Sequence, residues 1–242
     1  MRPAAGNLLD VPDSTVDAAD LVVAIDGPSG SGKSTVARRV AAALGLRYLD
    51  TGAMYRAVTW WALDQGVDLA DTERVAQLAR ELPLDQGLDP AAEALTVGGT
   101  DVAAEIRTSR ISAAVSAVAT NLGVRAELVA RQRAVARQGG VVIEGRDITT
   151  VVAPDAPVRV LLTADEHVRL SRRAIEVHGR DDDDAVEATR DQVVRRDADD
   201  STVASFLQAA DGVDVIDSSV LSLDETVDAV LKLVEARSGV RA

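Results

Sequence analysis

The fold is decided by one stretch near the start of the sequence, Gly27-Pro28-Ser29-Gly30-Ser31-Gly32-Lys33-Ser34-Thr35. It follows an apolar run, residues 21–25, and precedes a stretch rich in Ala, Val and Arg, residues 36–44. A strand, a glycine-rich turn and a helix form the context in which the pattern G-x-x-x-x-G-K-[ST] binds phosphate. Glycines let consecutive backbone N–H groups surround one anion at the positive end of a helix. All nine residues are therefore expected to bind a nucleotide triphosphate, with Lys33 on its β- and γ-phosphates and the Ser34 hydroxyl on Mg²⁺.

The composition indicates which classes of protein and which kinds of site can be excluded. Of 242 residues, 47% are hydrophobic and 27% are charged, as in ordinary soluble globular proteins. Cysteine is absent, which excludes disulfides, zinc–thiolate sites and thiol catalysis. The net charge of −13 argues against a broad nucleic-acid or membrane surface. Residues 1–20 lack a basic-then-apolar leader, so we expect a disordered tail there, and a cytoplasmic monomer.

Apolar runs alternate with helical periodicity along the rest of the chain, which predicts a parallel α/β sheet flanked by helices. The stretch 82–106 is different, because glycine and proline interrupt short runs and 95–102 resembles a hairpin. It predicts a small β insertion. Four aspartates at 181–184 predict a solvated turn. Strands are expected at 21–25, 47–49, 141–143, 158–162 and 213–216, and helices at 53–63, 72–82, 109–121, 125–138, 165–177, 184–196 and from the capping box at Ser222 through 233.

The phosphate loop by itself is compatible with GTPases, transport ATPases, helicases and small-molecule kinases. The sequence has no N-K-x-D or L-S-G-G-Q motif, and its small size argues against motors. Arginine forks suit phosphate because they hold two oxygens and stay charged. Singly, each arginine is more often a surface ion-pair partner. Grouped where strands and helices end, they predict a cage for two phosphorylated substrates, hence a kinase with an anionic acceptor: Arg56, Arg146, Arg169, Arg172, Arg173, Arg190, Arg195 and Arg196.

In order along the chain, six segments resemble bacterial cytidylate kinase, a nucleoside monophosphate kinase family. The phosphate loop is shared by many kinases, whereas D-[ST]-G-x-x-Y-R and E-G-R-D are far more specific. The segments span most of the chain: residues 25–33, 49–56 (Leu-Asp-Thr-Gly-Ala-Met-Tyr-Arg), 105–107 (Glu-Ile-Arg), 144–147 (Glu-Gly-Arg-Asp), 154–158 (Pro-Asp-Ala-Pro-Val) and 196–201 (Arg-Asp-Ala-Asp-Asp-Ser).

The resemblance implies transfer of a phosphoryl group from MgATP to CMP or dCMP. It also implies a P-loop NTPase-type sheet with a core at 21–60 and 120–242. A monophosphate-binding insertion at about 61–119 and a helical lid at about 164–184 would complete this domain. The remaining alternatives are a kinase for another nucleoside monophosphate or small anionic metabolite, and a nucleotide-binding regulator without transfer activity.

Residue roles follow from the same resemblance. Thr51, Tyr55 and Arg56 would line the acceptor, with Arg56 and Arg196 on its phosphate. Ser116 and Arg125 would contact cytosine, and Asp200 would accept the sugar hydroxyls. Asp147 would either accept a hydrogen bond from the base amine or organise Arg146. The residues expected to act in catalysis are Lys33, Arg146, Asp147, Arg169 and Arg173.

Two departures from the family pattern stand out. The family commonly carries R-D-x-x-D-S-x-R, and here the final position is Val203 in a segment about two residues shorter. The loss of a charged hydrogen bond to the acceptor phosphate would cost about 1.5–3 kcal/mol, so a weaker KM for the acceptor is expected. At position 149, where glycine is more usual, the chain has threonine, and an altered turn after Asp147 is expected.

Overall fold

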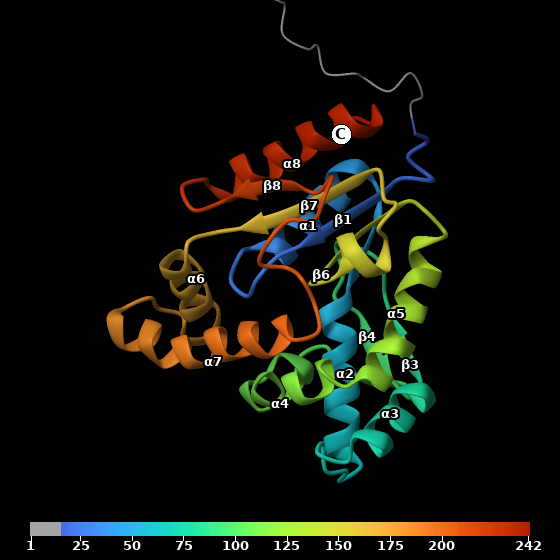
Figure 1. The fold of residues 1–242 in the computed structure, drawn as a ribbon, viewed down its shortest axis with the longest axis vertical. Helices are drawn as coiled ribbons and strands as arrows, with labels where there is room; N and C mark the ends of the chain where they lie inside the picture. Colours follow the sequence, from blue (N-terminus) through green and yellow to red (C-terminus); the bar gives the residue numbers. More distant parts are fainter. Residues whose placement is uncertain (1–15) are drawn as a thin grey trace, which may run out of the picture.

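The computed structural model describes residues 16–242, apart from the side chains of Asp191 and Gln192. Its centre is a five-stranded parallel sheet in the order β2-β6-β1-β7-β8 (Figure 1). β1 lies in the middle, with Val23 paired to Val142 on one side and Val158 on the other. The parallel α/β fold predicted from the sequence is thereby confirmed. The strands are β1 (Val22–Asp26), β2 (Arg47–Asp50), β6 (Val141–Gly145), β7 (Val158–Thr163) and β8 (Asp214–Asp217).

Helices cover both faces of the sheet, because successive strand residues point to opposite sides. Val23 and Ile25 pack in one apolar cluster with α1 (Lys33–Leu44) and α8 (Leu223–Ser238). Ala24 belongs to the opposite cluster, with α2 (Thr51–Asp64) and α5 (Leu122–Ala136). Both core clusters are mainly aliphatic. At Ser222 the capping box predicted from the sequence forms and begins α8.

The predicted β insertion is a three-stranded antiparallel sheet beside the main one, in the order β3-β4-β5. The β4–β5 turn is Gly98-Gly99, and both residues have positive φ, 58° and 83°, as a tight hairpin turn requires. The elements of this region are α3 (Thr72–Glu81), β3 (Leu84–Gln86), β4 (Leu95–Val97), β5 (Thr100–Asp101), a 3₁₀ turn (Glu105–Arg107) and α4 (Ser109–Ala119).

Three helical segments depart from the expectations, and the first is α8, which continues to Ser238, five residues beyond the expected end at 233. α7 (Asp183–Ser201) continues five residues beyond the expected end at 196. After Asp147 the chain forms a π-helical turn, Ile148–Val152, that periodicity did not indicate. The Asp26 carboxylate caps this turn, accepting the N–H of Ile148 at 2.9 Å and both the N–H and the hydroxyl of Thr149, at 2.8 and 2.6 Å. Threonine at this position therefore adds a bond that glycine lacks.

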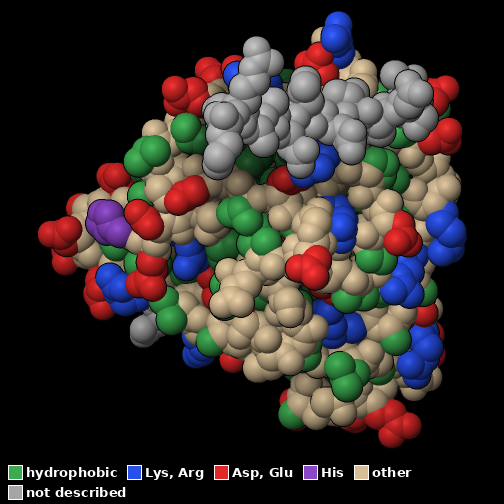
Figure 2. All heavy atoms as spheres, turned by 45° about the horizontal axis from the view of Figure 1, so that its top comes forward, with side chains coloured by type: hydrophobic (Ala, Val, Ile, Leu, Met, Phe, Trp, Pro, Cys, Tyr) green, Lys and Arg blue, Asp and Glu red, His purple; other side chains and the backbone are tan. Residues whose placement is uncertain are grey.

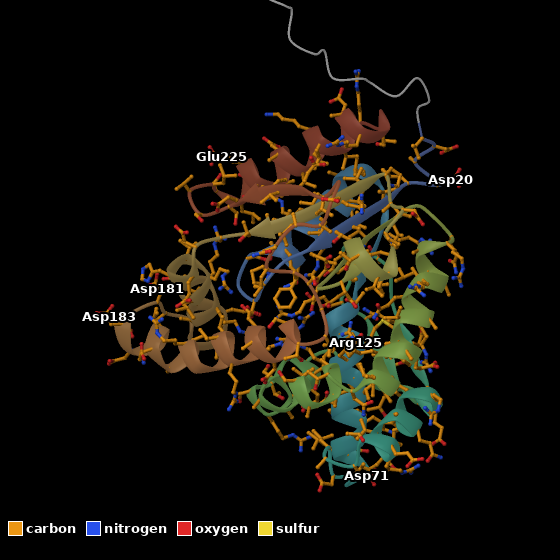
Figure 3. The ribbon with its side chains drawn as sticks, in the orientation of Figure 1. Asp20, Asp71, Arg125, Asp181, Asp183 and Glu225 are labelled. Carbon is orange, nitrogen blue, oxygen red and sulfur yellow. The ribbon has the colours of Figure 1, made fainter. Side chains whose placement is uncertain are left out.

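The ends and the surface complete the fold. Of the expected N-terminal tail, residues 1–15 lie outside the described part, and Val16 N–H donates to the Ser238 carbonyl at 3.0 Å. Charges of both signs are spread over the face in Figure 2. The expected acidic turn joins α6 (Glu166–His178) to α7. Asp181 and Asp183, which belong to this region, lie at the outer end of the two helices in Figure 3, away from Arg125.

No single helix within residues 16–242 is long and apolar enough to cross a membrane. Taken together, α4 and α5 meet the length and composition test, but they are bent by 97°.

Candidate active site

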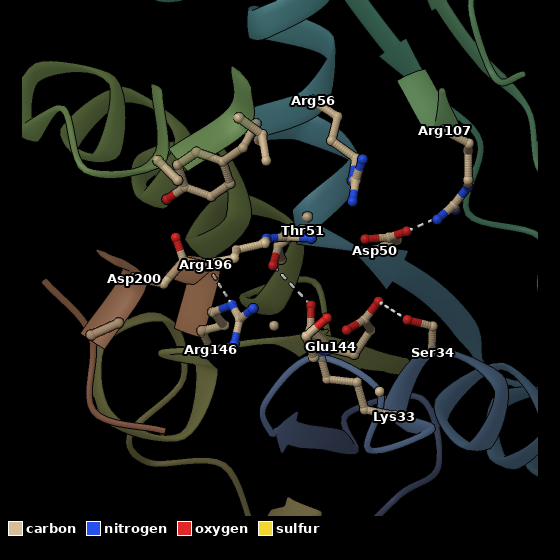
Figure 4. A pocket seen from close by; sticks show the side chains of 18 of the residues that line it. Lys33, Ser34, Asp50, Thr51, Arg56, Arg107, Glu144, Arg146, Arg196 and Asp200 are labelled. Carbon is tan, nitrogen blue, oxygen red and sulfur yellow. Dashed lines mark hydrogen bonds and ion pairs between the residues drawn. The ribbon is translucent and has the colours of Figure 1, made fainter. Parts of the chain in front are cut away.

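A cavity of about 380 Å³ opens at the carboxyl ends of β1, β2 and β6, the edge at which parallel sheets bind ligands (Figure 4). Residues distant in sequence meet there: the phosphate loop, the start of α2, the segment after β6, α5, α6 and the end of α7. The predicted residues that line it are Ser29, Gly30, Gly32, Lys33, Ser34, Thr35, Thr51, Tyr55, Arg56, Arg125, Arg146, Asp147, Arg173, Arg196 and Asp200.

The phosphate loop turns tightly into α1. Gly30 has a φ of 78°, and a Cβ at this position would lie 2.3 Å from the carbonyl oxygen of Arg169. Both the left-handed backbone conformation and the close contact therefore require glycine. Lys33 is the first residue of the helix, and its Nζ donates to the Pro28 carbonyl at 3.4 Å. Burial lowers the pKa of Lys33, while the charge of Glu144 opposes that shift. A phosphate in the loop would stabilise the ammonium further.

A carboxylate lies next to the loop hydroxyl. Ser34 Oγ donates to Glu144 Oε1 at 2.8 Å, and Tyr48 Oη approaches the same oxygen at 3.4 Å. Burial raises the pKa of Glu144, and Asp50 adds to the rise. No group of three His, Asp or Glu residues in the described chain could hold a metal. A hydroxyl with one carboxylate nevertheless suits Mg²⁺, which takes its other ligands from water and phosphates.

Arg56, Arg146, Arg173 and Arg196 all line the cavity, and Figure 4 labels three of them, Arg56, Arg146 and Arg196. Arg56 is 7% exposed and donates to the Ile106 carbonyl at 3.1 Å and to Ser112 Oγ at 2.9 Å. Burial lowers its pKa to about 9, and the charges of Arg196 and Arg173 add to that effect. The pKa of Arg196 falls to about 10 through burial and the charge of Arg146. Mutually repelling cations around one cavity are stabilised by a bound anion.

Two aspartates of α7 organise this arginine cluster. Asp200 Oδ2 lies 2.7 Å from Arg146 Nε and 3.6 Å from Arg196 Nε, while its Oδ1 is buried with no hydrogen-bond partner in residues 16–242. Asp197 accepts from the Ser29 N–H at 3.1 Å and from Arg169 Nη1 at 2.6 Å. The phosphate loop, α6 and α7 are thus tied through one carboxylate.

The far end of the cavity is polar and enclosed. Arg125 and Asp147 form an ion pair there, and their side chains are only 13% and 6% exposed. Burial raises the pKa of Asp147, although Arg125 opposes the shift. The Tyr55 hydroxyl, which lines the cavity, and the buried Asp200 Oδ1 have no properly aligned hydrogen-bond partner within the described residues. Such orphaned groups indicate a polar ligand or water at this end.

Comparison with known proteins settles the family. The sequence model of the family described as cytidylate kinase matches residues 23–236. The chain belongs to the cytidylate kinase family. It is 45% identical to the cytidylate kinase of Streptomyces avermitilis over 220 residues, which are 90% of this chain and 94% of that protein. The identity to the cytidylate kinase of Cutibacterium acnes is 50% over 216 residues, with 88% and 96% covered.

A solved structure shares the fold alone. This is an uncharacterised protein from Eubacterium ventriosum, with a TM-score of 0.51 and 14% identity, matched over 90% of this chain and 99% of that one. The resemblance drawn from the sequence motifs is confirmed by the family match and the curated relatives.

Some residues assigned from the cytidylate kinase motifs lie elsewhere. Ser116 points from α4 into a separate groove, which it lines with Arg195, Arg196 and Thr202. Arg169 ties α6 to Ser29 and Asp197 rather than lining the cavity, and Arg172 binds the carbonyl and hydroxyl of Ser218 at 2.8 and 2.9 Å. Loop residues Gly27, Pro28 and Ser31 also fall outside the lining.

Sequence reasoning assigned no role to Glu144, Asp197 or Gln132. Glu144 carried a usable signal, since it is a charge that ends the apolar run 141–143 of a central strand. Asp197 also carried a signal, as the second residue of the R-D-x-x-D-S pattern, whereas nothing in the sequence distinguishes Gln132 from the other polar residues of α5.

Proposed function

We propose that this protein transfers the γ-phosphoryl group of MgATP to CMP or dCMP and releases ADP with CDP or dCDP. One observation carries the proposal: a single cavity joins the Lys33 loop to an arginine cluster and to the enclosed Arg125–Asp147 pair. The loop suits a triphosphate, the cluster suits a second phosphate, and the ion pair suits a base with mixed donors and acceptors. Membership of the cytidylate kinase family supports the same acceptor.

The donor half rests on the loop. Its backbone and Lys33 would hold the β- and γ-phosphates of ATP, with all nine residues from Gly27 to Thr35 shaping the loop. Ser34 and Glu144 would hold Mg²⁺, Ser34 as a ligand and Glu144 directly or through water. When bound, Mg²⁺ screens the charge that spreads over the phosphates as the bond breaks.

The acceptor half rests on the arginines. Arg56 and Arg196 would bind the CMP phosphate, and Arg146 and Arg173 would neutralise the transferring group between the two substrates. One phosphate oxygen of CMP attacks the γ-phosphorus, a new P–O bond forms, and the bond to the ADP oxygen breaks. A phosphate monoester is already largely deprotonated at neutral pH, so no general base is needed. Positioning and charge neutralisation are the catalytic contributions.

Base and sugar selection would use the enclosed end. Arg125 and Asp147 offer a fixed donor beside a fixed acceptor, and Asp147 suits the 4-amino group of cytosine, where uracil has an oxygen. A mismatch would leave a buried polar group unpaired, which strongly discriminates between substrates. The orphaned Asp200 Oδ1 would accept a sugar hydroxyl, and Thr51 and Tyr55 would line the same pocket. Ser116 would reach the base only if α4 moved inward.

We also propose the domain division of the family: a core at 21–60 and 120–242, an insertion at about 61–119 that closes on CMP, and a lid at about 164–184. Closure excludes water, which would otherwise consume ATP. We further propose a monomer that acts on free nucleotides, without nucleic acid or membrane; the net charge of −13 supports the absence of a broad nucleic-acid or membrane surface. Both substrates are metabolites of the cytoplasm, where we place the reaction.

ADP release with CMP, dCMP, UMP and AMP tests the proposal. CMP or dCMP should be turned over fastest, and faster turnover of UMP or AMP would overturn the acceptor assignment. Lys33→Ala should abolish transfer and keep the thermal unfolding curve. The matched control is Lys232→Ala, which changes the other lysine of the chain, exposed on α8. ATP binding without any CDP formation would identify the alternative, a nucleotide-binding regulator.

A further inference from the structure

Phe206 is the single phenylalanine of the chain, and it is fully buried in an irregular segment. This segment follows α7, where the chain departs from the family pattern at Val203. The centre of the Phe206 ring lies 4.3 Å from Arg146 Cζ. Phe206 belongs to none of the apolar core clusters of the described residues. Its contact with Arg146, which lines the cavity, connects Phe206 to the candidate active site.

Arg146 is held from three directions. Its Nε lies 2.7 Å from Asp200 Oδ2, and its Nη1 lies 3.0 Å from Asp197 Oδ1. These carboxylates contact the nitrogens of the guanidinium, whereas the Phe206 ring contacts the group close to its central carbon. The two carboxylates alone would leave the Arg146 guanidinium free to tilt. The contact with the Phe206 ring restricts that tilt. The Arg146 side chain is consequently only 12% exposed at the cavity wall.

At this contact with the Arg146 guanidinium, an aromatic ring is more suitable than a third carboxylate would be. It attracts a cation through its quadrupole, with a larger effect where water is excluded. It accepts no conventional N–H bond and adds no third negative charge beside Asp197 and Asp200, so it holds the Arg146 guanidinium without neutralising it further. Nη1 of Arg146 is buried without a properly aligned hydrogen bond in the described chain, which leaves it able to respond to a ligand.

We propose that Phe206 is a positioning residue for phosphoryl transfer, holding the Arg146 guanidinium in the orientation that meets the transferring group. The proposal rests on the kinase activity proposed above, in which Arg146 touches that group. It predicts that Phe206 acts on kcat through the electron density of its ring, and much less on the KM for ATP.

The single phenylalanine makes a direct test possible. Expression in a phenylalanine auxotroph with mono-, di- or trifluorophenylalanine changes only position 206. Fluorine weakens the ring quadrupole and barely changes its size, so kcat with CMP should fall stepwise, to about five- to tenfold below wild type at three fluorines. Phe206→Leu should show at least that loss. Leu207→Ala, at the exposed neighbour, is the matched control and should leave kcat unchanged.

A flat kcat across the fluorine series, with wild type active, would overturn the role of Phe206 and leave the proposed kinase intact. A wild type inactive toward every monophosphate would instead overturn the proposed function. The contact itself is then still testable by thermal unfolding. Fluorination should lower Tm when Arg146 is present and have no such effect in the Arg146→Met variant. Equal shifts in both backgrounds would show that the ring contributes packing alone.

Discussion

Ser34 and Glu144 stand 110 positions apart, and the Ser34 hydroxyl donates to Glu144 Oε1 at 2.8 Å. Ser34 belongs to the first turn of α1, whereas Glu144 lies near the carboxyl end of β6. The parallel pairing of β1 with β6 sets Ile25 opposite Glu144, which brings this carboxylate to the phosphate loop. The sheet register thus adds a carboxylate to the hydroxyl that the loop supplies for the proposed Mg²⁺.

Glu144→Gln should raise the Mg²⁺ concentration needed for half-maximal activity and lower the rate by about 10–100-fold. The amide keeps the size of the side chain and removes its charge. Initial rates against Mg²⁺ at saturating ATP and CMP measure the effect. Glu187→Gln, at an exposed carboxylate of α7, is the control. An unchanged Mg²⁺ dependence would remove Glu144 from the metal site.

Arg125→Ala should reduce the preference for CMP over UMP by about tenfold or more, because Asp147 would remain buried without its ionic partner. The ratio of kcat/KM for the two nucleotides is the measurement. Arg131→Ala, at a salt bridge on the same helix, serves as the control. If the ratio stayed at its wild-type value, the enclosed end would not be the base site.

Val203→Arg should lower the KM for CMP by about tenfold or more and leave the KM for ATP unchanged. A further arginine near Arg196 would add a charged hydrogen bond to the acceptor phosphate. Val203→Leu supplies the control for size. A KM that rises in the arginine variant would mean that the existing cluster already satisfies the phosphate and suffers from added repulsion.

Thr149→Val should make stability more dependent on pH. Burial raises the pKa of Asp26 to about 6, while its hydrogen bond from Thr149 opposes the rise. The folded state therefore holds the Asp26 proton more tightly than the unfolded chain, and the contribution of Asp26 to stability falls by about 3 kcal/mol as the pH rises from 4 through 6.

Removal of the Thr149 hydroxyl raises this pKa further, so the Tm deficit of the variant should be small at pH 4 and larger at pH 8. Thermal unfolding at both values measures it. Thr149→Ser keeps the hydroxyl and should follow wild type. A Tm deficit of equal size at both pH values would show that the Thr149 hydroxyl does not act on the ionisation of Asp26.

Local patterns were sufficient for most of the fold. Five apolar runs became the five parallel strands, the Ser222 box began α8, and Gly98-Gly99 made the β4–β5 turn. Each depends on neighbours within a few residues, where side-chain type restricts the backbone directly. The π-helical turn after Asp147 escaped prediction because its cap, Asp26, is more than a hundred residues away.

A phosphate loop in a parallel α/β sheet and the motifs of the cytidylate kinase family are evident from short stretches of the amino-acid sequence. Which side chains share one cavity is evident only in the folded chain. The tertiary structure places Glu144 beside Ser34, turns Ser116 away from the cavity and sets Phe206 against Arg146. The reason is physical: a motif fixes backbone geometry over a few residues, whereas burial, charge and ring contacts depend on strand order and helix packing across the whole chain.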